Sequence, residues 1–289
     1  MPSGQIICLG ASVRSSAYPA SSWDYLASFP SLISIQELWA EMDRVWEDCL
    51  RKHCKKFTNA FFAEYYTHPV WCLNSIFSEV DPASIHNREA LIEAIEPLGV
   101  NSIVDMGGGY GVFLRMLKKR IPYTKVILCE PYISEEIETE LRKNDILTTK
   151  QAPAGEDAYI FLDVLEHLTN PLSYLDGILS AARSNSYFIF GNCFYPFIKC
   201  HLAGTFYLRH TFVIAARLMG LRYIRDVEGA EYIQIYRLEA KSDINPQIAA
   251  LVAKVAAFLL VPIRLLIGVA RKAKRIARKL VLVLFGRGT

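Results

Sequence analysis

A glycine-rich turn directly after a short apolar run carries the clearest chemical signal in this sequence. The run 102–105 ends in a carboxylate, Asp105, and glycines follow at positions 107, 108, 109 and 111. Glycines permit positive φ and let a ligand approach bare backbone. Apolar residues at helical spacing then occupy residues 112–121. The stretch therefore predicts a buried strand, a ligand-binding turn and a helix.

The glycine spacing separates two classes of cofactor. A dinucleotide fingerprint, G-x-G-x-x-G, that begins at Gly107 would need glycine at position 112, which is Val. The pattern present is Asp-x-Gly-x-Gly-x-Gly over residues 105–111, and a second acid, Glu130, ends the next apolar run. This combination resembles the class I S-adenosylmethionine-dependent methyltransferases.

The resemblance implies S-adenosylmethionine as the cofactor. It also implies that the glycines admit the methionine portion against backbone, and that Glu130 accepts both hydroxyls of the ribose. A later segment, Asp163-Val-Leu-Glu-His-Leu-Thr-Asn-Pro171, resembles the segment after the fourth strand in the small-molecule branch, which includes ubiquinone-type O-methyltransferases. The resemblance implies that Asp163 of this segment lies beside the methionine end of the cofactor. The implied cofactor-binding residues are Asp105, Gly107, Gly109, Gly111, Glu130 and Asp163.

Apolar runs and helical stripes alternate after residue 98 and predict an α/β fold. We expect a Rossmann-like, mostly parallel sheet of seven strands, closed by an antiparallel hairpin. The strands are expected near 102–105, 125–130, 146–149, 158–163, 186–191, 221–226 and 231–238. Helices are expected near 112–120, 134–143 and 171–183. This catalytic domain would span residues 98–240.

Residues 1–97 are expected to form an N-terminal helical cap. Residues 1–30 read as irregular, whereas Ser34 and Glu37 form a capping box for a helix. An aromatic-rich stretch, 57–71, predicts a second helix, and 87–97 a third. Most of these aromatic side chains are expected in the core; alternatively, one near Tyr65 faces the cofactor.

Three histidines in segments expected near the strand ends are candidates for a general base: His201, His210 and His167. Lys199 and Arg209 could hold an anionic acceptor, or could be solvated cations. The only sequence-local metal candidate, Cys49-x-x-x-His53-Cys54, lacks further ligands, so no metal site is expected.

The last segment, residues 246–289, differs sharply in composition from the rest of the chain. It contains nine Lys or Arg residues and no Asp or Glu, although the net charge of the chain is only +3. In a helical projection the basic residues gather on one side, so we expect an amphipathic helix on an anionic membrane surface. Lys254, Pro262 and Arg264 interrupt any spanning stretch. Docking on the body or on a second subunit is the alternative.

The expected function is methyl transfer to oxygen, or nitrogen, of a small-molecule, sugar or lipid-linked saccharide acceptor. Residues 192–220 would determine the acceptor, and the segment 194–201 resembles methyltransferases of polysaccharide assembly. Seven scattered cysteines without a C-x-x-C pair predict a reducing, cytoplasmic location. With the basic tail, the expected location is the inner face of the membrane. No nucleic-acid partner is expected. A catalytically silent membrane-tethered scaffold and an NAD-dependent oxidoreductase are the alternatives, and the acceptor and oligomeric state stay open.

Overall fold

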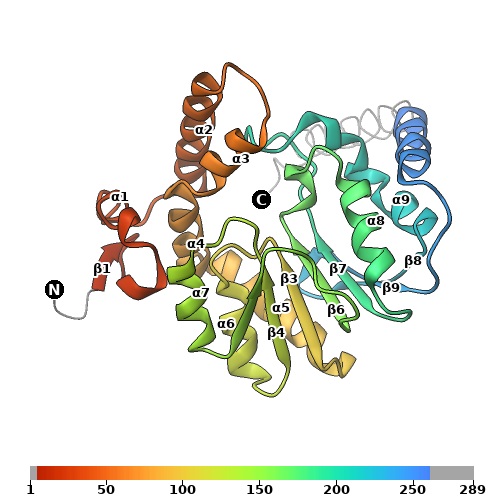
Figure 1. Ribbon diagram of the computed structural model, residues 1–289, viewed down its shortest axis with the longest axis horizontal. Helices are drawn as coiled ribbons and strands as arrows, with labels where there is room; N and C mark the ends of the chain where they lie inside the picture. The colour runs from red at the N-terminus through yellow and green to blue at the C-terminus, as the bar shows by residue number, and fades with distance from the viewer. Residues whose placement is uncertain (1–4, 261–289) are drawn as a thin grey trace, which may run out of the picture.

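A seven-stranded sheet forms the centre of the computed structural model, which describes residues 5–260 (Figure 1). The strand order is β5-β4-β3-β6-β7-β9-β8; the first five strands are parallel, and β9 runs antiparallel to both β7 and β8. The strands are β3 (Ser102–Met106), β4 (Lys125–Cys129), β5 (Ile146–Thr149), β6 (Ala158–Leu162), β7 (Tyr187–Gly191), β8 (Leu221–Val227) and β9 (Ala230–Leu238). The predicted Rossmann-like sheet with its closing hairpin is confirmed.

Helices cover both faces of the sheet, so the central strands are apolar on both sides. All five residues of β3 are buried. Two successive residues of this strand, Ile103 and Val104, belong to separate apolar clusters. One cluster contains side chains from α5 (Pro82–Ile95), α6 (Val112–Arg120) and α7 (Glu135–Arg142). The other contains side chains from α8 (Pro171–Ala181), α9 (Phe212–Leu218) and the helical residues 246–260. This burial explains why the strands read as continuous apolar runs.

The N-terminal cap is a third apolar cluster beside the sheet. It contains α2 (Ile35–Lys52), α3 (Asn59–Tyr66) and α4 (Val70–Val80). The predicted capping box of Ser34 and Glu37 is confirmed at the start of α2. Trp46 of α2 is 4% exposed and meets the rings of Phe61 and Tyr65 edge-on, at centroid distances of 4.8 and 4.9 Å. Most of the predicted core aromatics therefore are core.

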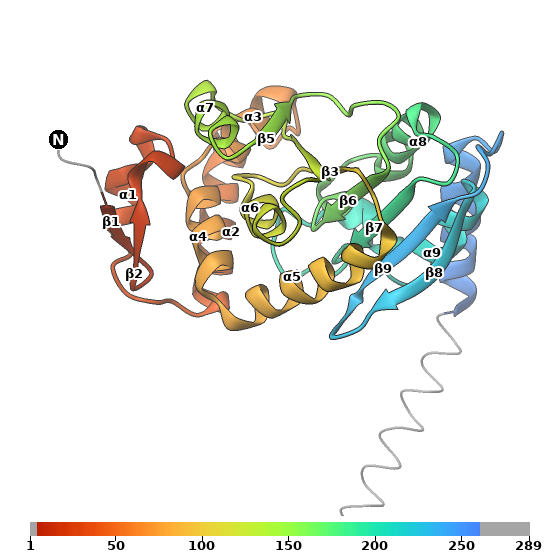
Figure 2. The same cartoon turned by 90° about the horizontal axis from the view of Figure 1, so that it is seen from below.

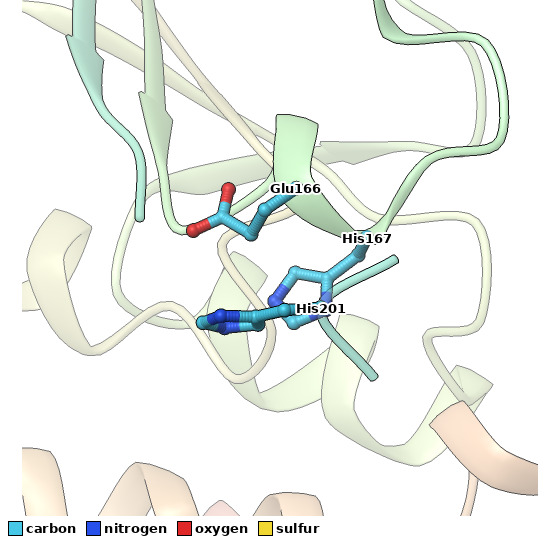
Figure 3. Close-up of side chains that lie close together, drawn as sticks. All are labelled: Glu166, His167 and His201. Atoms are coloured by element: carbon cyan, nitrogen blue, oxygen red, sulfur yellow. The ribbon is translucent and has the colours of Figure 1, made fainter. Parts of the chain in front are cut away.

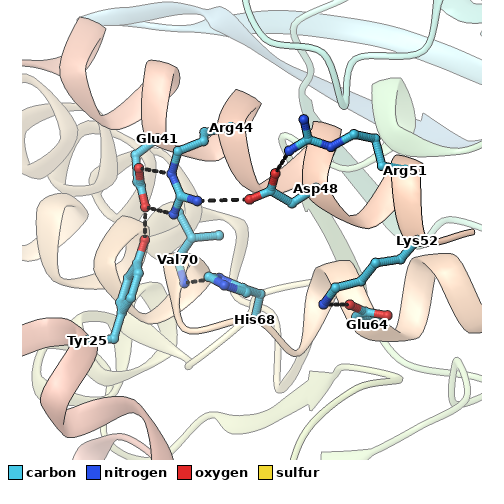
Figure 4. Close-up of polar contacts among 9 residues, drawn as sticks. All are labelled: Tyr25, Glu41, Arg44, Asp48, Arg51, Lys52, Glu64, His68 and Val70. Atoms are coloured by element: carbon cyan, nitrogen blue, oxygen red, sulfur yellow. Dashed lines mark hydrogen bonds and ion pairs between the residues drawn. The ribbon is translucent and has the colours of Figure 1, made fainter.

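Polar contacts fix the outer side of this cap (Figure 4). Tyr25 of α1 (Trp23–Ala27) donates a hydrogen bond to Glu41 at 2.7 Å, and Arg44 binds both Glu41 and Asp48. In the turn before α4, the ring Nδ1 of His68 accepts a hydrogen bond from the backbone of Val70 at 3.1 Å. His68 therefore serves the cap rather than the cavity described below.

The expectation of irregular structure in residues 1–30 was wrong. Strands β1 (Gln5–Cys8) and β2 (Ala11–Arg14) form a hairpin, followed by the short helices η1 (Ser15–Ala17) and η2 (Ala20–Ser22) before α1. Leu9 and Gly10 both have positive φ, 50° and 75°, as a two-residue hairpin turn requires. Cys8 and Tyr18 are fully buried in the cap cluster. This hairpin was not predicted, because a composition rich in Ser and Pro is typical of irregular structure.

Two further elements differ from the predicted cap. The aromatic stretch is split at Pro69, which begins a separate helix, α4, that the sequence analysis missed. The helix expected over 87–97 begins earlier, because Asp81 caps it through a hydrogen bond to the backbone of Ser84 at 2.8 Å, and a short η3 (Glu96–Leu98) follows it. The domain boundaries proposed at residues 97 and 240 stay predictions.

The cap and residues 246–260 lie at opposite ends of the molecule (Figure 2). Ala249 and Ala253 are fully buried in the apolar cluster that also contains side chains of α8 and α9. The remainder of the predicted amphipathic helix, 261–289, lies outside the described residues.

Candidate active site

The loop between β3 and α6 presents bare backbone because a side chain has no room there. A Cβ on Gly108 would lie 2.1 Å from the carboxylate of Asp105 and 2.8 Å from Leu128. Gly111 takes the left-handed conformation, with φ 71°, at the N-cap of α6. The loop is anchored to the neighbouring strand, since the backbone of Gly107 donates to Cys129 at 2.8 Å.

Glu130 holds this loop from the end of β4. Its carboxylate accepts hydrogen bonds from the backbone of Gly109 and of Tyr132, each at 3.2 Å. Burial raises the pKa of the Glu130 carboxyl, and these two backbone donors partly oppose that rise. The acid predicted to end the second strand therefore lies directly against the glycine loop.

A cavity of about 850 Å³ opens beside the glycine loop. Its walls come from α2, α4, α5, the loop itself, the segments after β6 and β7, and β9. The predicted residues that line it are Asp105, Gly107, Gly109, Asp163, His167 and His201. Three predicted residues lie elsewhere: Gly111 caps α6, Glu130 supports the loop, and His210 is exposed at the end of η5 (Ala203–His210).

Two carboxyls on the cavity wall have raised pKa values. Asp105 is only 2% exposed, and burial raises the pKa of its carboxyl to about 7. Asp163 has a positive φ of 53°, a strained conformation that Asp tolerates and that turns its side chain at the end of β6. Loss of solvent raises the pKa of Asp163 to about 6. In both cases the guanidinium of Arg88 opposes the rise.

Arg88 of α5 is a cavity residue that the sequence analysis did not identify. Its Nη1 donates to the carbonyl of Ser84 at 3.0 Å, whereas its Nε is buried and has no partner in the structure. A buried guanidinium N–H without an acceptor is costly and suggests a ligand. Arg88 is therefore suited to bind an anionic group, such as a carboxylate, beside the glycine loop.

A second group of titratable side chains lies close together in the segments after β6 and β7 (Figure 3). Glu166 and His167 belong to η4 (Leu165–His167), and His201 follows β7; one ligand atom from each lies within 4.8 Å of the others. The Nδ1 atoms of His167 and His201 contact the carbonyls of Cys200 at 3.2 Å and Tyr195 at 2.6 Å. A ring nitrogen that meets a carbonyl must carry the proton, so the other nitrogen of each ring offers a lone pair.

Burial sets the protonation of this group. It raises the pKa of Glu166 to about 8, helped by nearby Asp163, and lowers the pKa of His167 to about 3, helped by His201. Burial also lowers the pKa of His201, against the effect of its hydrogen bond to the Tyr195 carbonyl. One Glu166 oxygen accepts from the backbone of Cys193 at 2.6 Å, and the other is buried without a partner. At neutral pH both imidazoles are uncharged and face a protonated carboxyl.

No family model matches the sequence. An uncharacterised methyltransferase of Mycobacterium bovis is 30% identical over 108 residues, which cover 34% of this chain and 54% of that protein. An uncharacterised methyltransferase of Mycobacterium tuberculosis gives the same values. The chain thus spans about half the length of the curated relatives it matches. The strand order and the glycine loop agree with this partial match. The chain has the fold of a class I methyltransferase.

Two solved structures show a more distant similarity to this chain. PigF with SAH is 14% identical, with 70% of this chain and 69% of that chain covered and a TM-score of 0.47. A putative O-methyltransferase from Nostoc punctiforme is 13% identical, with 70% and 71% covered and a TM-score of 0.46.

The acidic wall of the methyltransferase domain suits a cationic methyl donor. S-adenosylmethionine carries a sulfonium and an amino group that favour nearby carboxylates, and a carboxylate that would find Arg88. Sequence reasoning missed Arg88 because nothing in its own helix distinguishes it from a surface residue. Glu166 lay within the motif that was recognised, but its closeness to His201 depends on the fold.

The group of Glu166, His167 and His201 is also suited to a divalent cation. Two nitrogens and a carboxylate oxygen are common ligands, at about 2.0 to 2.2 Å from the metal, so ligand atoms around a tetrahedral ion lie about 3.4 Å apart. The atoms here lie within 4.8 Å of one another and would have to approach by up to about 1.4 Å. The carbonyl contacts of both Nδ1 atoms would orient the rings. The expectation of no metal weighed only Cys49, His53 and Cys54, and among these His53 instead pairs with Glu64.

We predict that Arg88→Ala weakens binding of S-adenosylhomocysteine roughly 10- to 100-fold, since hydrogen bonds to charged groups contribute about 1.5 to 3 kcal/mol. Calorimetry measures the affinity, and a melting curve checks that the variant is folded. Arg225→Ala is the matched control, because Arg225 also contacts α5, through the carbonyl of Ala94, but does not line the cavity. Unchanged affinity in folded Arg88→Ala would contradict this role.

We further predict that Mn²⁺ or Zn²⁺ at pH 7.5 raises the melting temperature of the wild-type protein but not of Glu166→Gln. Binding at 100 times the dissociation constant adds about 2.7 kcal/mol, and it should release a proton from Glu166. His53→Ala should keep the full shift. A wild-type protein that does not respond, or a response that Glu166→Gln retains, would exclude a cation at this group.

Proposed function

We propose that this methyltransferase domain transfers a methyl group from S-adenosylmethionine to a hydroxyl oxygen of a small-molecule or saccharide acceptor. The main support is the position of His201, an uncharged imidazole on the wall of the cavity that also contains the glycine loop and Asp163. An oxygen acceptor needs a group that removes its proton, and a nitrogen acceptor generally does not.

The reaction is an in-line displacement. The acceptor oxygen forms a bond to the methyl carbon while the bond from that carbon to sulfur breaks, and the sulfonium becomes a neutral thioether. The hydroxyl proton passes to the lone-pair nitrogen of His201, which can accept it only while no cation is bound to the group of Glu166, His167 and His201. The enzyme contributes chiefly by holding both reactants in line.

His201 is well placed for the proton because its orientation and tautomer are fixed. It is only 9% exposed, and its Nδ1 is held by the Tyr195 carbonyl at 2.6 Å. His167 packs edge-on against it, at 5.0 Å between ring centroids. Burial lowers the pKa of His201 from its ordinary value of 6.5, so the imidazole is unprotonated at neutral pH.

Two alternatives lead to different measurements. A catalytically silent scaffold would bind neither S-adenosylmethionine nor its product, and an NAD-dependent oxidoreductase would bind a dinucleotide. The glycine spacing and the acidic wall both weigh against a dinucleotide, whose pyrophosphate would face Asp105 and Asp163.

We predict that His201→Ala lowers turnover by roughly two to four decades, the range for loss of a general base, with little change in S-adenosylhomocysteine affinity. In the wild-type enzyme, turnover should fall only below about pH 6.5, because the lowered pKa delays protonation of the base.

His210→Ala is the matched control and should behave as the wild type, since its side chain lies outside the cavity. Equal turnover in His201→Ala, His167→Ala and wild type would instead indicate an acceptor that is already nucleophilic, such as an amine.

We also propose that the domain attaches to an anionic membrane surface through the segment that begins at residue 246. Small residues bury one side of its helix, so larger apolar residues face outward. The exposed residues are Ile248, Leu251, Val252, Val255, Phe258 and Leu259, with Phe258 77% exposed. Exposed apolar patches of this kind mark interaction sites.

A lipid surface fits this outward apolar face best. In sequence, the positions after it, 261–289, hold eight Lys or Arg and no acidic residue, a composition that favours anionic lipid. Among the helices of residues 5–260, none has the length and apolar character needed to cross a bilayer. A lipid-linked saccharide, presented at the cytoplasmic leaflet during polysaccharide assembly, would be an acceptor consistent with such attachment.

We predict that the full-length protein floats with liposomes that contain anionic lipid and does so less in high salt. Replacing both Leu251 and Leu259 with Ser should reduce flotation strongly, while the packing of Ala249 and Ala253 keeps the helix docked. Exposed Leu147→Ser on β5 is the control. Flotation that is absent, or unaffected by the double substitution, would contradict the attachment.

A further inference from the structure

Four side chains form a continuous stack at one side of the cavity. Trp39 of α2 stacks on Phe197 at 5.5 Å with an interplanar angle of 6°, and Phe197 stacks on Tyr195 at 5.4 Å and 8°. The guanidinium of Arg209 lies 3.1 Å from the centroid of the Tyr195 ring. The stack joins the N-terminal cap to the segment after β7, which are far apart in the sequence.

The three rings belong to the cavity and retain free surface. Trp39, Phe197 and Tyr195 all line it, and Phe197 is 54% exposed although rings stack on it from both neighbours. The position of Phe197 is fixed by the next turn of chain, because the backbone of Lys199 donates to Asp43 at 2.6 Å and its ammonium pairs with Glu47. Phe197 is therefore a rigid aromatic surface at the cavity mouth.

The stack is connected directly to the proposed base. Tyr195 carries the ring that lies between Phe197 and Arg209, and its carbonyl accepts the 2.6 Å contact from Nδ1 of His201. A ligand that rests on the rings thus has a fixed relation to His201.

The charges around the cavity weigh against a charged acceptor. An anion would lie in the same cavity as the carboxyls of Asp105 and Asp163, and Arg88, the cation beside the glycine loop, is assigned to the carboxylate of the methyl donor. Lys199, which the sequence suggested for an anionic acceptor, pairs with Glu47 instead, and Arg209 covers Tyr195. The stacked rings instead offer an apolar surface to a ligand.

We infer that the acceptor is an uncharged, hydroxylated six-membered ring that lies on Phe197 and Trp39 and points its hydroxyl toward His201. This inference rests on the proposed methyl transfer. A pyranose offers C–H bonds and a phenol offers a π face, so both present the shared chemistry, and the experiment distinguishes them.

The test is saturation-transfer NMR on full-length protein loaded with S-adenosylhomocysteine. The ring probes are methyl β-glucopyranoside and catechol; the comparison probes are sorbitol, an open-chain polyol, and methyl β-glucuronide, an anion. We expect one ring probe to bind and the comparison probes not to bind. Phe197→Leu should weaken the ring probe about threefold to tenfold, Phe197→Tyr should restore it, and Tyr123→Ala, a fully exposed residue, should have no effect.

Three outcomes would overturn the inference: no binding of either ring, equal binding of sorbitol or glucuronide, or unchanged ring binding in Phe197→Leu. Saturation of methyl glucopyranoside alone would identify a sugar acceptor, and of catechol alone a phenol. Failure of the protein to bind S-adenosylhomocysteine would instead count against the methyl transfer itself.

Discussion

The desolvation of carboxylates around one cavity is the constraint on which the rest of the site depends. Asp105 and Asp163 line the cavity at the ends of β3 and β6, Glu166 is buried close to Asp163, and burial raises the pKa of all three. Arg88 lines the same cavity, and its positive charge opposes the rise in pKa of Asp105 and Asp163. A cationic methyl donor would stabilise the ionised form of these carboxyls, whereas its product, a neutral thioether, would stabilise it less. The wall therefore favours binding of the methyl donor over binding of its product.

The sheet supplies the cofactor half of this cavity and the cap supplies the other half. Parallel strands β3, β6 and β7 end at one edge, where open α/β sheets bind ligands. Asn192, after β7, accepts hydrogen bonds from the backbones of Val164 and Leu165, at 3.3 and 2.9 Å, and so ties two of these loops together. Helices α2 and α4 close the cavity from the cap.

Much of the domain could be predicted because its signals are local. The run that ends at Asp105, the glycines after it and the alternation of strands and helices follow from neighbouring residues, and the sheet confirms them. Arg88 could not be recognised, because its unpaired Nε depends on how α5 packs. His201 and His210 looked alike in sequence, and only the fold places one on the cavity wall and the other at an exposed helix end. The N-terminal hairpin was missed because its strands of four residues give too short a periodic signal.

Cofactor identity is the central claim, and calorimetry tests it most directly. Full-length protein is titrated with S-adenosylmethionine, with S-adenosylhomocysteine and with NADH. The account predicts one-to-one binding of the first two ligands, tighter for the sulfonium because of the acidic wall, and no binding of NADH. Binding of NADH, or failure to bind either adenosyl compound, would contradict it.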